Sequence, residues 1–314
     1  MNILISGANG FIGRALVKKM SCHNLSACGR NDKGLPSNCL FHYVDISPTT
    51  DYSNAVLDID VVIHTAARVH LMKESSSEPL REFRKVNAEG TLNFARQSAE
   101  SGVKRFIFIS SIKVNGERTT KGNLFTANDE AKPEDPYGIS KAEAEERLKA
   151  LAADTGMEVV IIRPTLVYGP GVKANFAAMM KLASKGIPLP FGAIKENRRS
   201  LVSIDNLVDL IVTCIDHLKA ANETFLVSDN EDLSTTDMFS RLSKACGKST
   251  FLIPIPISLF EKVFRLIGKP EIYLRLCGSL QVDISDTMQK LGWKPPYSTD
   301  ECFAKTAKHY LEKE

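Results

Sequence analysis

The sequence contains no long apolar run and no concentration of one charge. Its 314 residues are 43% hydrophobic and 25% charged, with a formal net charge of +3. A membrane-spanning helix needs roughly 20 consecutive apolar residues, and the N-terminal MNILISGANG lacks the apolar segment of a secretory signal. Long basic runs are also missing. The composition therefore argues against nucleic-acid and membrane partners, and we expect a cytoplasmic protein.

Cysteine is present but never closely paired. The seven cysteines are scattered singly, without the short spacings typical of metal sites. Thiols of cytoplasmic proteins are normally reduced, so we expect neither a disulfide framework nor a metal centre. His64 lies in an apolar stretch with no other metal ligand near it, and we expect a packed core histidine there.

Short apolar runs alternate with amphipathic stretches through the first half of the chain. Near-continuous Val, Ile and Leu runs between helices predict a parallel sheet covered on both faces. The sequence thus indicates an α/β fold with a doubly wound parallel sheet. The expected strands are 2–6, 25–28, 40–45, 60–66, 104–110 and 158–164, and the expected helices are 11–20, 79–101 and one beginning at 136.

The pattern changes after about residue 165, where proline and glycine cluster in YGPGV and GIPLPFG. We predict a first domain over 1–165 and a smaller mixed C-terminal lobe over 166–314, with some segments returning to the main sheet. The lobe is expected to contain helices at 174–185, 206–219, 235–246, 257–267 and 299–312, and strands at 223–229 and in RRSLVSI.

A glycine-rich loop follows the first strand. LISGANGFIG places Gly7, Gly10 and Gly13 between a strand and the start of a helix. The first glycine makes a tight turn, the second lets the backbone approach a pyrophosphate, and the third lets helix and strand pack closely. The helix N-terminus, with Phe11 and Ile12 in its first turn, offers N–H groups to phosphates. The loop predicts dinucleotide binding by the first domain.

The GxxGxxG spacing resembles the extended, nucleotide-sugar-modifying branch of the short-chain dehydrogenase/reductase superfamily, which has a Rossmann fold. In that branch an acidic residue usually ends the second strand and binds the ribose 2′-hydroxyl. Here Gly29 takes that place and Arg30 follows. Arginine can bind a 2′-phosphate that an acid would repel, so we expect NADP rather than NAD, assisted by Arg14. In the alternative, Arg30 faces solvent and Asp32 binds the ribose.

The resemblance also implies further cofactor contacts along the chain. Small residues at the end of the fourth strand would let the cofactor approach the backbone, and an asparagine would hold the loop beneath the nicotinamide. The implied cofactor residues are Asp45, Ile46, Ala66, Ala67, Asn87, Ser110, Tyr137, Lys141 and Pro164.

Three residues resemble the catalytic set of this superfamily. Ser111 ends the strand in FIFISS, and Tyr137 and Lys141 are one helical turn apart in DPYGISK. The resemblance implies that the tyrosine exchanges a proton with the substrate oxygen and that the serine hydrogen-bonds this oxygen. The lysine would bind the nicotinamide ribose and lower the tyrosine pKa from about 10. The pair alone would also suit a solvated helix face; its combination with Ser111 and the glycine loop favours an active site.

Departures from the family pattern reduce the number of reactions that this chain is expected to catalyse. Sugar dehydratases of this branch carry an Asp-Glu pair where this chain has Ile112 and Lys113. An isoleucine cannot move a proton, which argues against dehydration. Asn115 and Leu166 stand where many members have tyrosine and asparagine, respectively.

The second half resembles the substrate-binding part of these enzymes. Asn175 corresponds to an asparagine at the sugar or diphosphate. Arg199, with Arg198 beside it, corresponds to an arginine that binds the diphosphate, for which a guanidinium fork is well suited. Arg275 is a second candidate with a less regular spacing. Trp293 is expected to be a core residue.

A narrower resemblance follows from HTAARVHLMKE, SSIKVNG, RPTLVYGPGVKANF, RRSLVSIDNLV and GSLQVDIS. These stretches resemble bacterial surface-polysaccharide enzymes identified as UDP-glucose or UDP-N-acetylglucosamine 4-epimerases, and 4-reductases of UDP-4-keto-6-deoxy-N-acetylglucosamine. Arg30 and the missing acid favour the NADPH-dependent reductase; the alternative is a 4-epimerase with retained NAD. A non-catalytic cofactor sensor has no need of the three catalytic residues. The resemblance also implies a homodimer formed through the helices at 79–101 and 136–155.

Overall fold

The computed structural model describes residues 1–21, 23–37, 39–69 and 78–312. Cys22 and the part of HTAARVHLMKE from His70 onward lie outside the described residues.

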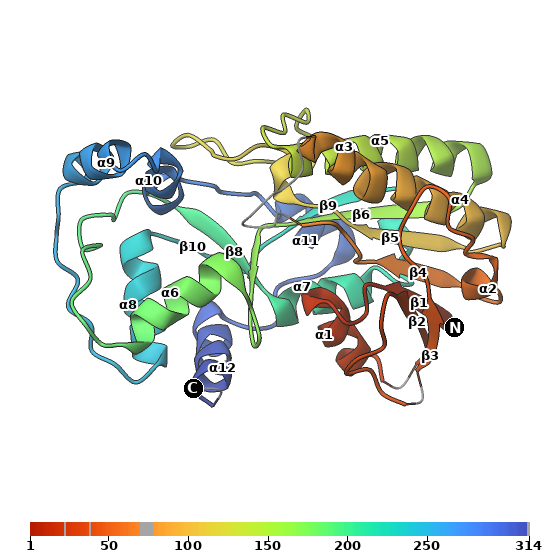
Figure 1. Cartoon of the computed structure of the whole chain (residues 1–314), viewed down its shortest axis with the longest axis horizontal. Helices are drawn as coiled ribbons and strands as arrows, with labels where there is room; N and C mark the ends of the chain where they lie inside the picture. The colour runs from red at the N-terminus through yellow and green to blue at the C-terminus, as the bar shows by residue number, and fades with distance from the viewer. Residues whose placement is uncertain (22, 38, 70–77, 313–314) are drawn as a thin grey trace.

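A seven-stranded parallel sheet forms the centre of the larger part of the molecule (Figure 1). Its order is β3-β2-β1-β4-β5-β6-β9, so the chain winds outward in both directions from β1 and β4. The doubly wound α/β fold is therefore confirmed. The strands are β1 (Asn2–Ser6), β2 (Asn24–Gly29), β3 (Leu40–Tyr43), β4 (Val61–His64), β5 (Arg105–Ile109), β6 (Glu158–Pro164) and β9 (Thr224–Val227).

Alternate residues of each strand enter two separate cores. Ile3, Ile63 and Ile107 pack with α1 (Phe11–Lys19) and α7 (Ile204–Thr213) on one face. The intervening residues pack on the other face with α2 (Ser53–Val56), α4 (Thr91–Glu100) and α5 (Pro136–Thr155). Each fully buried Ile or Leu side chain contributes roughly 1.5–3 kcal/mol. Burial on both faces explains why these strands are almost uninterrupted apolar runs.

His64 is a packed core histidine, as predicted. Its Nδ1 lies 2.6 Å from Ser6 Oγ and its Nε2 lies 2.9 Å from Thr91 Oγ1. Burial, and secondarily the charge of Lys141, lower its pKa from 6.5 to about 3, so the ring is neutral at ordinary pH.

The long helix expected over 79–101 is divided into three segments. α3 (Pro79–Arg84) continues as a π-helix, η1 (Lys85–Gly90), and then as α4. The sequence periodicity did not predict this change of winding. At its end a Cβ on Gly90 would lie 3.0 Å from Ile46 Cγ2, so α4 begins in close contact with the chain after β3. Single π-turns of this kind are frequent at functional sites.

The smaller lobe contains a three-stranded mixed sheet with the order β10-β8-β7. Four of its helices were expected, but β7, β10, α10 and α11 were not. Trp293 is a core residue, but it belongs to the core on the α1 face of the main sheet, and its indole N–H donates to Asp209 Oδ2 at 3.0 Å. The lobe elements are β7 (Leu166–Tyr168), α6 (Ala174–Ser184), β8 (Arg199–Ser203), β10 (Asp232–Leu233), α8 (Thr235–Ala245), α9 (Ile257–Leu266), α10 (Pro270–Cys277) and α12 (Thr299–Leu311). Helix α11 (Ser285–Leu291) instead packs against β9 of the main sheet.

Three segments from beyond residue 165, α7, β9 and α11, belong to the main sheet rather than to the smaller lobe. Strand β9 pairs with β6 at one edge of the sheet, and α7 packs beside α1 on its face. The bounds 1–165 and 166–314 therefore remain a prediction about domains, while the return of later segments is a feature of the fold.

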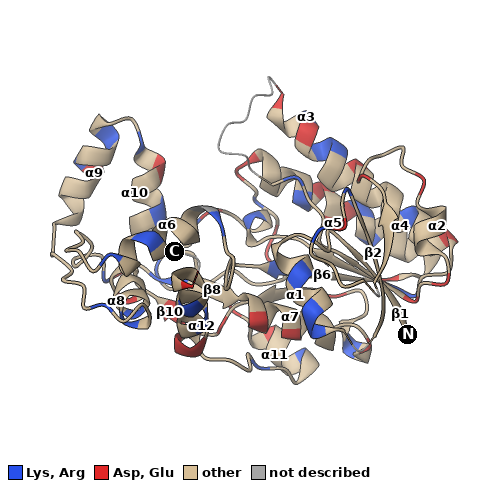
Figure 2. Cartoon of the chain, turned by 60° about the horizontal axis from the view of Figure 1, so that its bottom comes forward, with Lys and Arg blue, Asp and Glu red and all other residues tan. Residues whose placement is uncertain are grey.

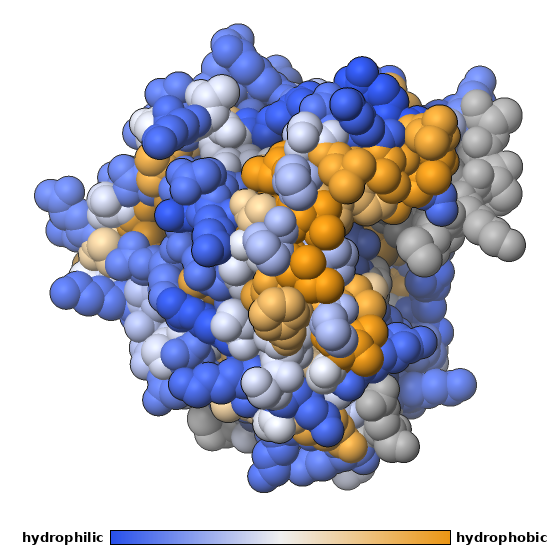
Figure 3. Space-filling model, turned by 90° about the vertical axis from the view of Figure 1, so that its left-hand side faces the viewer, coloured by the Kyte–Doolittle hydropathy of each residue, from blue (hydrophilic) through white to orange (hydrophobic). Residues whose placement is uncertain are grey.

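Charges of both signs are distributed over the outer helices (Figure 2). The end of the molecule formed by α9 and α10 differs, because apolar side chains gather on its surface (Figure 3). Its exposed apolar residues include Leu259, Val263, Leu266 and Ile267, at helical spacing. Among the described residues no helix combines the length and apolar character needed to cross a membrane. The cytoplasmic location stays a prediction.

Candidate active site

The expected site residues gather where the strand order reverses. Strands β1 and β4 are neighbours in the sheet, and the chain continues from them in opposite directions. In doubly wound sheets ligands bind in the crevice beyond the carboxyl ends of the strands at such a point. The glycine loop follows β1, Ala66 and Ala67 follow β4, and Ser110 and Ser111 follow β5.

The glycine loop has the shape that a dinucleotide requires. Gly7 has a φ of +70°, and a Cβ there would lie 2.8 Å from Ala66 N. A Cβ on Gly13 would collide with Gly7 O and lie 2.6 Å from Ala8 Cα. The backbone thus leaves no room for side chains at these positions. Within the described chain no side chain caps the N-terminus of α1 at Gly10. The loop therefore fits a bound pyrophosphate.

The loop after β2 carries the residues expected at the adenosine ribose. Arg30 is exposed, and Arg14 donates to Lys33 O at 3.3 Å. Asp32 Oδ2 accepts a hydrogen bond from the Tyr43 hydroxyl at 3.0 Å. Arg14 therefore lies next to this loop, and Asp32 is already engaged by the neighbouring strand.

Asn87 hydrogen-bonds to the main chain of the loop after β4, while the position of this loop beneath a nicotinamide stays a prediction. Its Oδ1 accepts from Arg68 N at 2.8 Å, and its Nδ2 donates to Arg68 O and to Ser140 Oγ, both at 3.0 Å. The π-helix carries this buried asparagine, which therefore connects the loop to α5. Elsewhere on the cofactor side, Ile46 is buried against Gly90, whereas Asp45 is exposed.

Tyr137 lies in the first turn of α5, which begins at Pro136. Asp135 caps this helix, its Oδ1 accepting from Gly138 N at 2.7 Å. A Cβ on Gly138 would lie 2.8 Å from Lys113 O, so this turn is in close contact with the short helix η2 (Ile112–Val114). Ser111 is the N-cap of η2 and its Oγ accepts from Lys113 N at 3.2 Å. The structure thus brings the Ser111 turn against the Tyr137 turn.

Lys141 lies one turn further along α5 and is buried. Its ammonium donates to Ile109 O at 2.8 Å, lies 4.3 Å from the centre of the Phe108 ring, and lies 6.0 Å from that of Tyr137. Burial lowers the pKa of Lys141 from 10.5 to about 7, while the charge of Glu145 acts in the opposite direction. The lysine is therefore only partly charged at neutral pH.

The lowered pKa expected for Tyr137 is not found. Burial, and secondarily the negative charge of Asp135, raise the Tyr137 pKa above its ordinary value. The physical reason is that the Lys141 ammonium is directed at Ile109 O and at the Phe108 ring. In this structure the Lys141 charge therefore does not offset the effect of burial on the tyrosine pKa.

A buried ion pair beneath the catalytic turn was missed from the sequence. Glu145 and Arg163 form a double contact, with Nε to Oε1 at 2.9 Å and Nη2 to Oε2 at 2.5 Å. Ser110 Oγ donates to Glu145 Oε1 at 2.5 Å, and Arg163 Nη1 donates to Asn115 Oδ1 at 3.0 Å. The hydroxyl of Ser110 is therefore turned to this ion pair; its contact with a cofactor stays a prediction, as does that of Pro164.

The two candidate diphosphate arginines come together. Arg199 Nη1 donates to Arg275 O at 2.9 Å and to Gly278 O at 3.1 Å. Burial lowers the pKa of Arg199; Glu117 raises it, and the charge of Arg275 lowers it further. Arg198 is instead directed at Lys195 O at 2.6 Å. Two neighbouring cations, one half-buried, suit an anionic group.

The arginines are connected to the catalytic loop through main-chain contacts. Thr119 N donates to Ser279 O, and Phe125 N to Gln281 O, both at 2.9 Å. The segment that follows η2 thus packs against the lobe segment that follows Arg275. Asn175, in the first turn of α6, is exposed, and its contact with a substrate stays a prediction.

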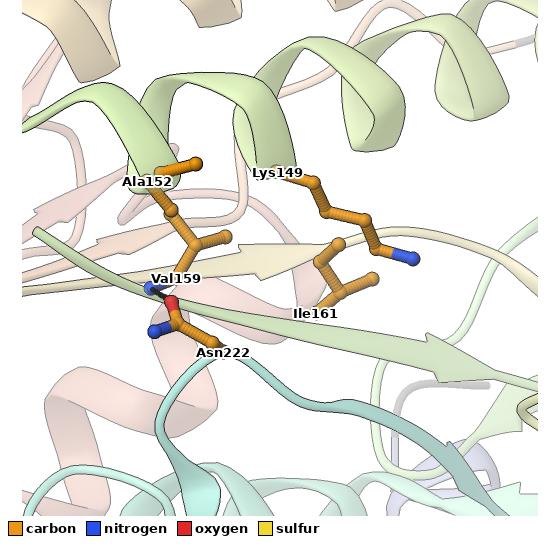
Figure 4. A pocket seen from close by; sticks show the side chains of 6 residues that line it. Lys149, Ala152, Val159, Ile161 and Asn222 are labelled. Carbon is orange, nitrogen blue, oxygen red and sulfur yellow. Dashed lines mark hydrogen bonds between the residues drawn. The ribbon is translucent and has the colours of Figure 1, made fainter. Parts of the chain in front are cut away.

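A cavity of about 370 Å³ lies elsewhere and is not this site (Figure 4). It is lined by the C-terminal half of α5, including Lys149, by Val159 and Ile161 of β6, and by Asn222. Lys149 is eight residues beyond Lys141, or roughly 12 Å along the helix. Lys149 is its only charged lining residue in the described chain.

Comparison with known proteins agrees with this arrangement. The family model described as "NAD dependent epimerase/dehydratase family" matches residues 3–228. A UDP-glucose 4-epimerase of Vibrio cholerae is 53% identical over 314 residues, covering 99% of this chain and 96% of the relative. Solved structures share the fold. UDP-glucose 4-epimerase of Thermotoga maritima with UDP-glucose has a TM-score of 0.78 at 24% identity, covering 100% and 99% of the two chains. UDP-glucuronic acid 4-epimerase of Bacillus cereus in complex with NAD has a TM-score of 0.78 at 22% identity, and the match covers 99% of each chain. The chain is thus an enzyme of the NAD dependent epimerase/dehydratase family, as its resemblance to the extended short-chain dehydrogenase/reductases predicted.

Proposed function

We propose that this enzyme is a UDP-sugar 4-epimerase that interconverts UDP-glucose and UDP-galactose or their N-acetylated counterparts. The observation that carries the proposal is the 53% identity, over nearly the whole of both chains, to the UDP-glucose 4-epimerase of Vibrio cholerae. This relationship favours the epimerase over the 4-keto reductase that Arg30 had favoured, and we adopt the epimerase.

The cluster of Ser111, Tyr137 and Lys141 supports this chemistry. The nicotinamide dinucleotide, when bound, supplies hydride acceptance and donation at C4 of the sugar. Tyr137 takes the proton from the 4-hydroxyl and returns it, and Ser111 donates a hydrogen bond to the same oxygen. Lys141, one turn further along α5, provides an ammonium donor to the same site. Arg199 and Arg275 bind the diphosphate of the nucleotide sugar.

For the cofactor we propose retained NAD. The glycine loop supports a dinucleotide of either kind, and the family description and the NAD-bound Bacillus cereus structure support NAD. The NADP preference inferred from Arg30 is kept as an outcome of the test below. The Cβ position of Gly29 is open, 3.7 Å from Phe41 Cζ, so the backbone leaves room for a Cβ and Gly29→Asp is a suitable test variant. That acid is expected to abolish any NADP binding and to leave NAD binding intact.

The test begins with denaturing the purified protein and identifying the nucleotide it releases. We expect NAD or NADH, and interconversion of UDP-glucose and UDP-galactose without added cofactor, followed by NMR of the anomeric protons. Tyr137→Phe is expected to lower the rate by at least about 100-fold with the same nucleotide retained. A protein that releases no nucleotide and consumes NADPH only with a 4-keto sugar would instead be a reductase.

We also propose a homodimer formed through α3, α4 and α5. These helices lie side by side on one face of the sheet (Figure 1), and Arg84 of α3 pairs with Glu143 of α5 at 2.6 Å. The chain mass is 34.6 kDa. Light scattering at micromolar concentration is expected to give twice this mass, and the monomer mass would contradict the dimer.

A further inference from the structure

Ser111 is held between two fixed points. It follows Ser110, which comes directly after β5, and it is the N-cap of η2, whose C-cap is Asn115. Both flanking residues are buried, with 3% and 2% of their surface exposed, whereas Ser111 is half-buried. The position of the Ser111 hydroxyl is therefore set by what holds Ser110 and Asn115.

One ion pair holds both points. Glu145 accepts from Ser110 Oγ at 2.5 Å, and Arg163 donates to Asn115 Oδ1 at 3.0 Å. The side chains of Glu145 and Arg163 are only 4% and 5% exposed. A charge-assisted pair with two parallel contacts has little freedom of orientation, so each end of the turn is fixed to the same rigid group.

The two charged residues come from different elements. Glu145 lies on α5, four residues after Lys141 and eight after Tyr137, and therefore on the same side of the helix. Arg163 lies near the end of β6. Their ion pair thus connects the helix of the proton-transferring pair with the turn of the serine that shares the substrate oxygen.

We propose that Glu145 and Arg163 are positioning residues that act through Ser111, by fixing Ser110 and Asn115 on either side of it. The inference rests on the proposed function, in which Ser111 contacts the sugar oxygen. In the alternative, the buried ion pair only stabilises the fold. The two hypotheses predict different activities when the hydrogen bond to Ser110 or to Asn115 is removed and the ion pair itself is kept.

Ser110→Ala cuts the connection to Glu145. Asn115→Ala cuts the connection to Arg163 together with the hydrogen bond that Asn115 Nδ2 donates to Thr126 O at 2.8 Å. Both variants leave Glu145 paired with Arg163. We expect each to lower kcat for UDP-sugar interconversion roughly 10- to 100-fold, the scale of a small misplacement of a reacting group. KM and the amount of retained nucleotide should change less than about 2-fold. Ser98→Ala is the matched control, since Ser98 is a buried serine that donates to Phe94 O in α4 and should leave kcat unchanged.

The decisive measurement repeats both variants in a Ser111→Ala background. If they act through Ser111, they should lower the residual kcat by less than about 2-fold there. Full additional losses in that background would overturn the proposal, as would unchanged kcat in the single variants. Loss of the nucleotide from Ser110→Ala would show that Ser110 serves the cofactor instead, and would equally overturn it.

A second readout does not depend on activity. In hydrogen exchange, the amides of Lys113, Val114 and Asn115, which hydrogen-bond within the turn, should exchange faster in Asn115→Ala, while amides of α4 stay protected. Faster exchange in a protein without epimerase activity would reject the proposed function and retain the positioning role. Unchanged exchange would reject the positioning role.

Discussion

At the scale of single residues, Lys141 shows how burial and function compete. Its ammonium lies over Phe108 and donates to a main-chain oxygen, and its pKa is lowered to about 7 by burial. A lysine in the unfolded chain titrates near 10.5. Between pH 7 and pH 10.5 the lysine is mostly protonated in the unfolded chain and mostly neutral in the folded one. The free energy of unfolding therefore rises with pH over this range and falls as the pH is lowered towards 7.

Lys141→Met should therefore change the pH dependence of unfolding. We expect the variant to be more stable than the parent near pH 7, and the difference to shrink by about 1–3 kcal/mol towards pH 9.5. Urea unfolding of both proteins, without bound nucleotide, at pH 7, 8 and 9.5 measures this. Parallel curves would mean that Lys141 keeps its ordinary pKa.

Adjacent arginines should contribute very differently to substrate binding. Arg199 is half-buried beside Arg275, whereas Arg198 is exposed and directed at Lys195 O. A hydrogen bond to a charged group contributes about 1.5–3 kcal/mol. Arg199→Met is therefore expected to raise KM for the UDP-sugar roughly 10- to 100-fold, and Arg198→Met to change it little. Steady-state kinetics of the two variants measures both KM values. Equal increases in KM would contradict the assignment of Arg199 to the diphosphate site.

At the scale of elements, the sequence predicted those features whose signal lies within a few consecutive residues. The glycine loop, the strands of the main sheet and the Pro136 start of α5 each carry a signal within a few residues. The pairing of Glu145 with Arg163 has no such local signal. The two residues are 18 positions apart on different elements, and in the sequence each has the appearance of an ordinary surface charge. The π-helix was missed for a similar reason. Its extra residue per turn is stabilised by the contacts of Asn87 and Gly90, which only the folded chain brings together.

Helix α9 has one apolar face that is packed and another that is exposed. Phe260 is 8% exposed and its ring is 6.1 Å from both Phe191 and Phe264, whereas Leu266 is 88% exposed. Phe260→Ala should cost roughly 3 kcal/mol through the cavity it leaves. Leu266→Ala should change the free energy of unfolding by less than about 0.5 kcal/mol. Urea unfolding of the two variants compares the faces, and a large cost for Leu266→Ala would show that its face is covered in solution.

At the scale of the whole molecule, the main sheet depends on residues from the second half of the chain. The core on the α1 face includes Leu207 and Ile211 from α7, Phe225 from β9, and Trp293. Sequence patterns located these elements but not their places in the fold, since a short apolar run has the same appearance whether it joins the main sheet or the smaller lobe. The order of strands is a property of the packed molecule.

A fragment of residues 1–165 should therefore fail to fold independently. It lacks α7 and β9, so it exposes the apolar face of α1 and the edge of β6. We expect the fragment to show no cooperative transition in urea and to be degraded rapidly by proteases. The full chain is expected to show a cooperative transition and to give protease-resistant fragments. A fragment with a cooperative transition and native circular dichroism would establish 1–165 as an autonomous domain.

The late arrival of β9 has a consequence during synthesis on the ribosome. Strand β6 ends at Pro164, but its neighbour is complete only at Val227. At roughly 5–20 residues per second, translation of the intervening segment takes about 3–13 s. For that time the nascent chain presents an unpaired, apolar strand edge that other chains can join. The nascent enzyme is therefore expected to engage cellular chaperones until this edge closes.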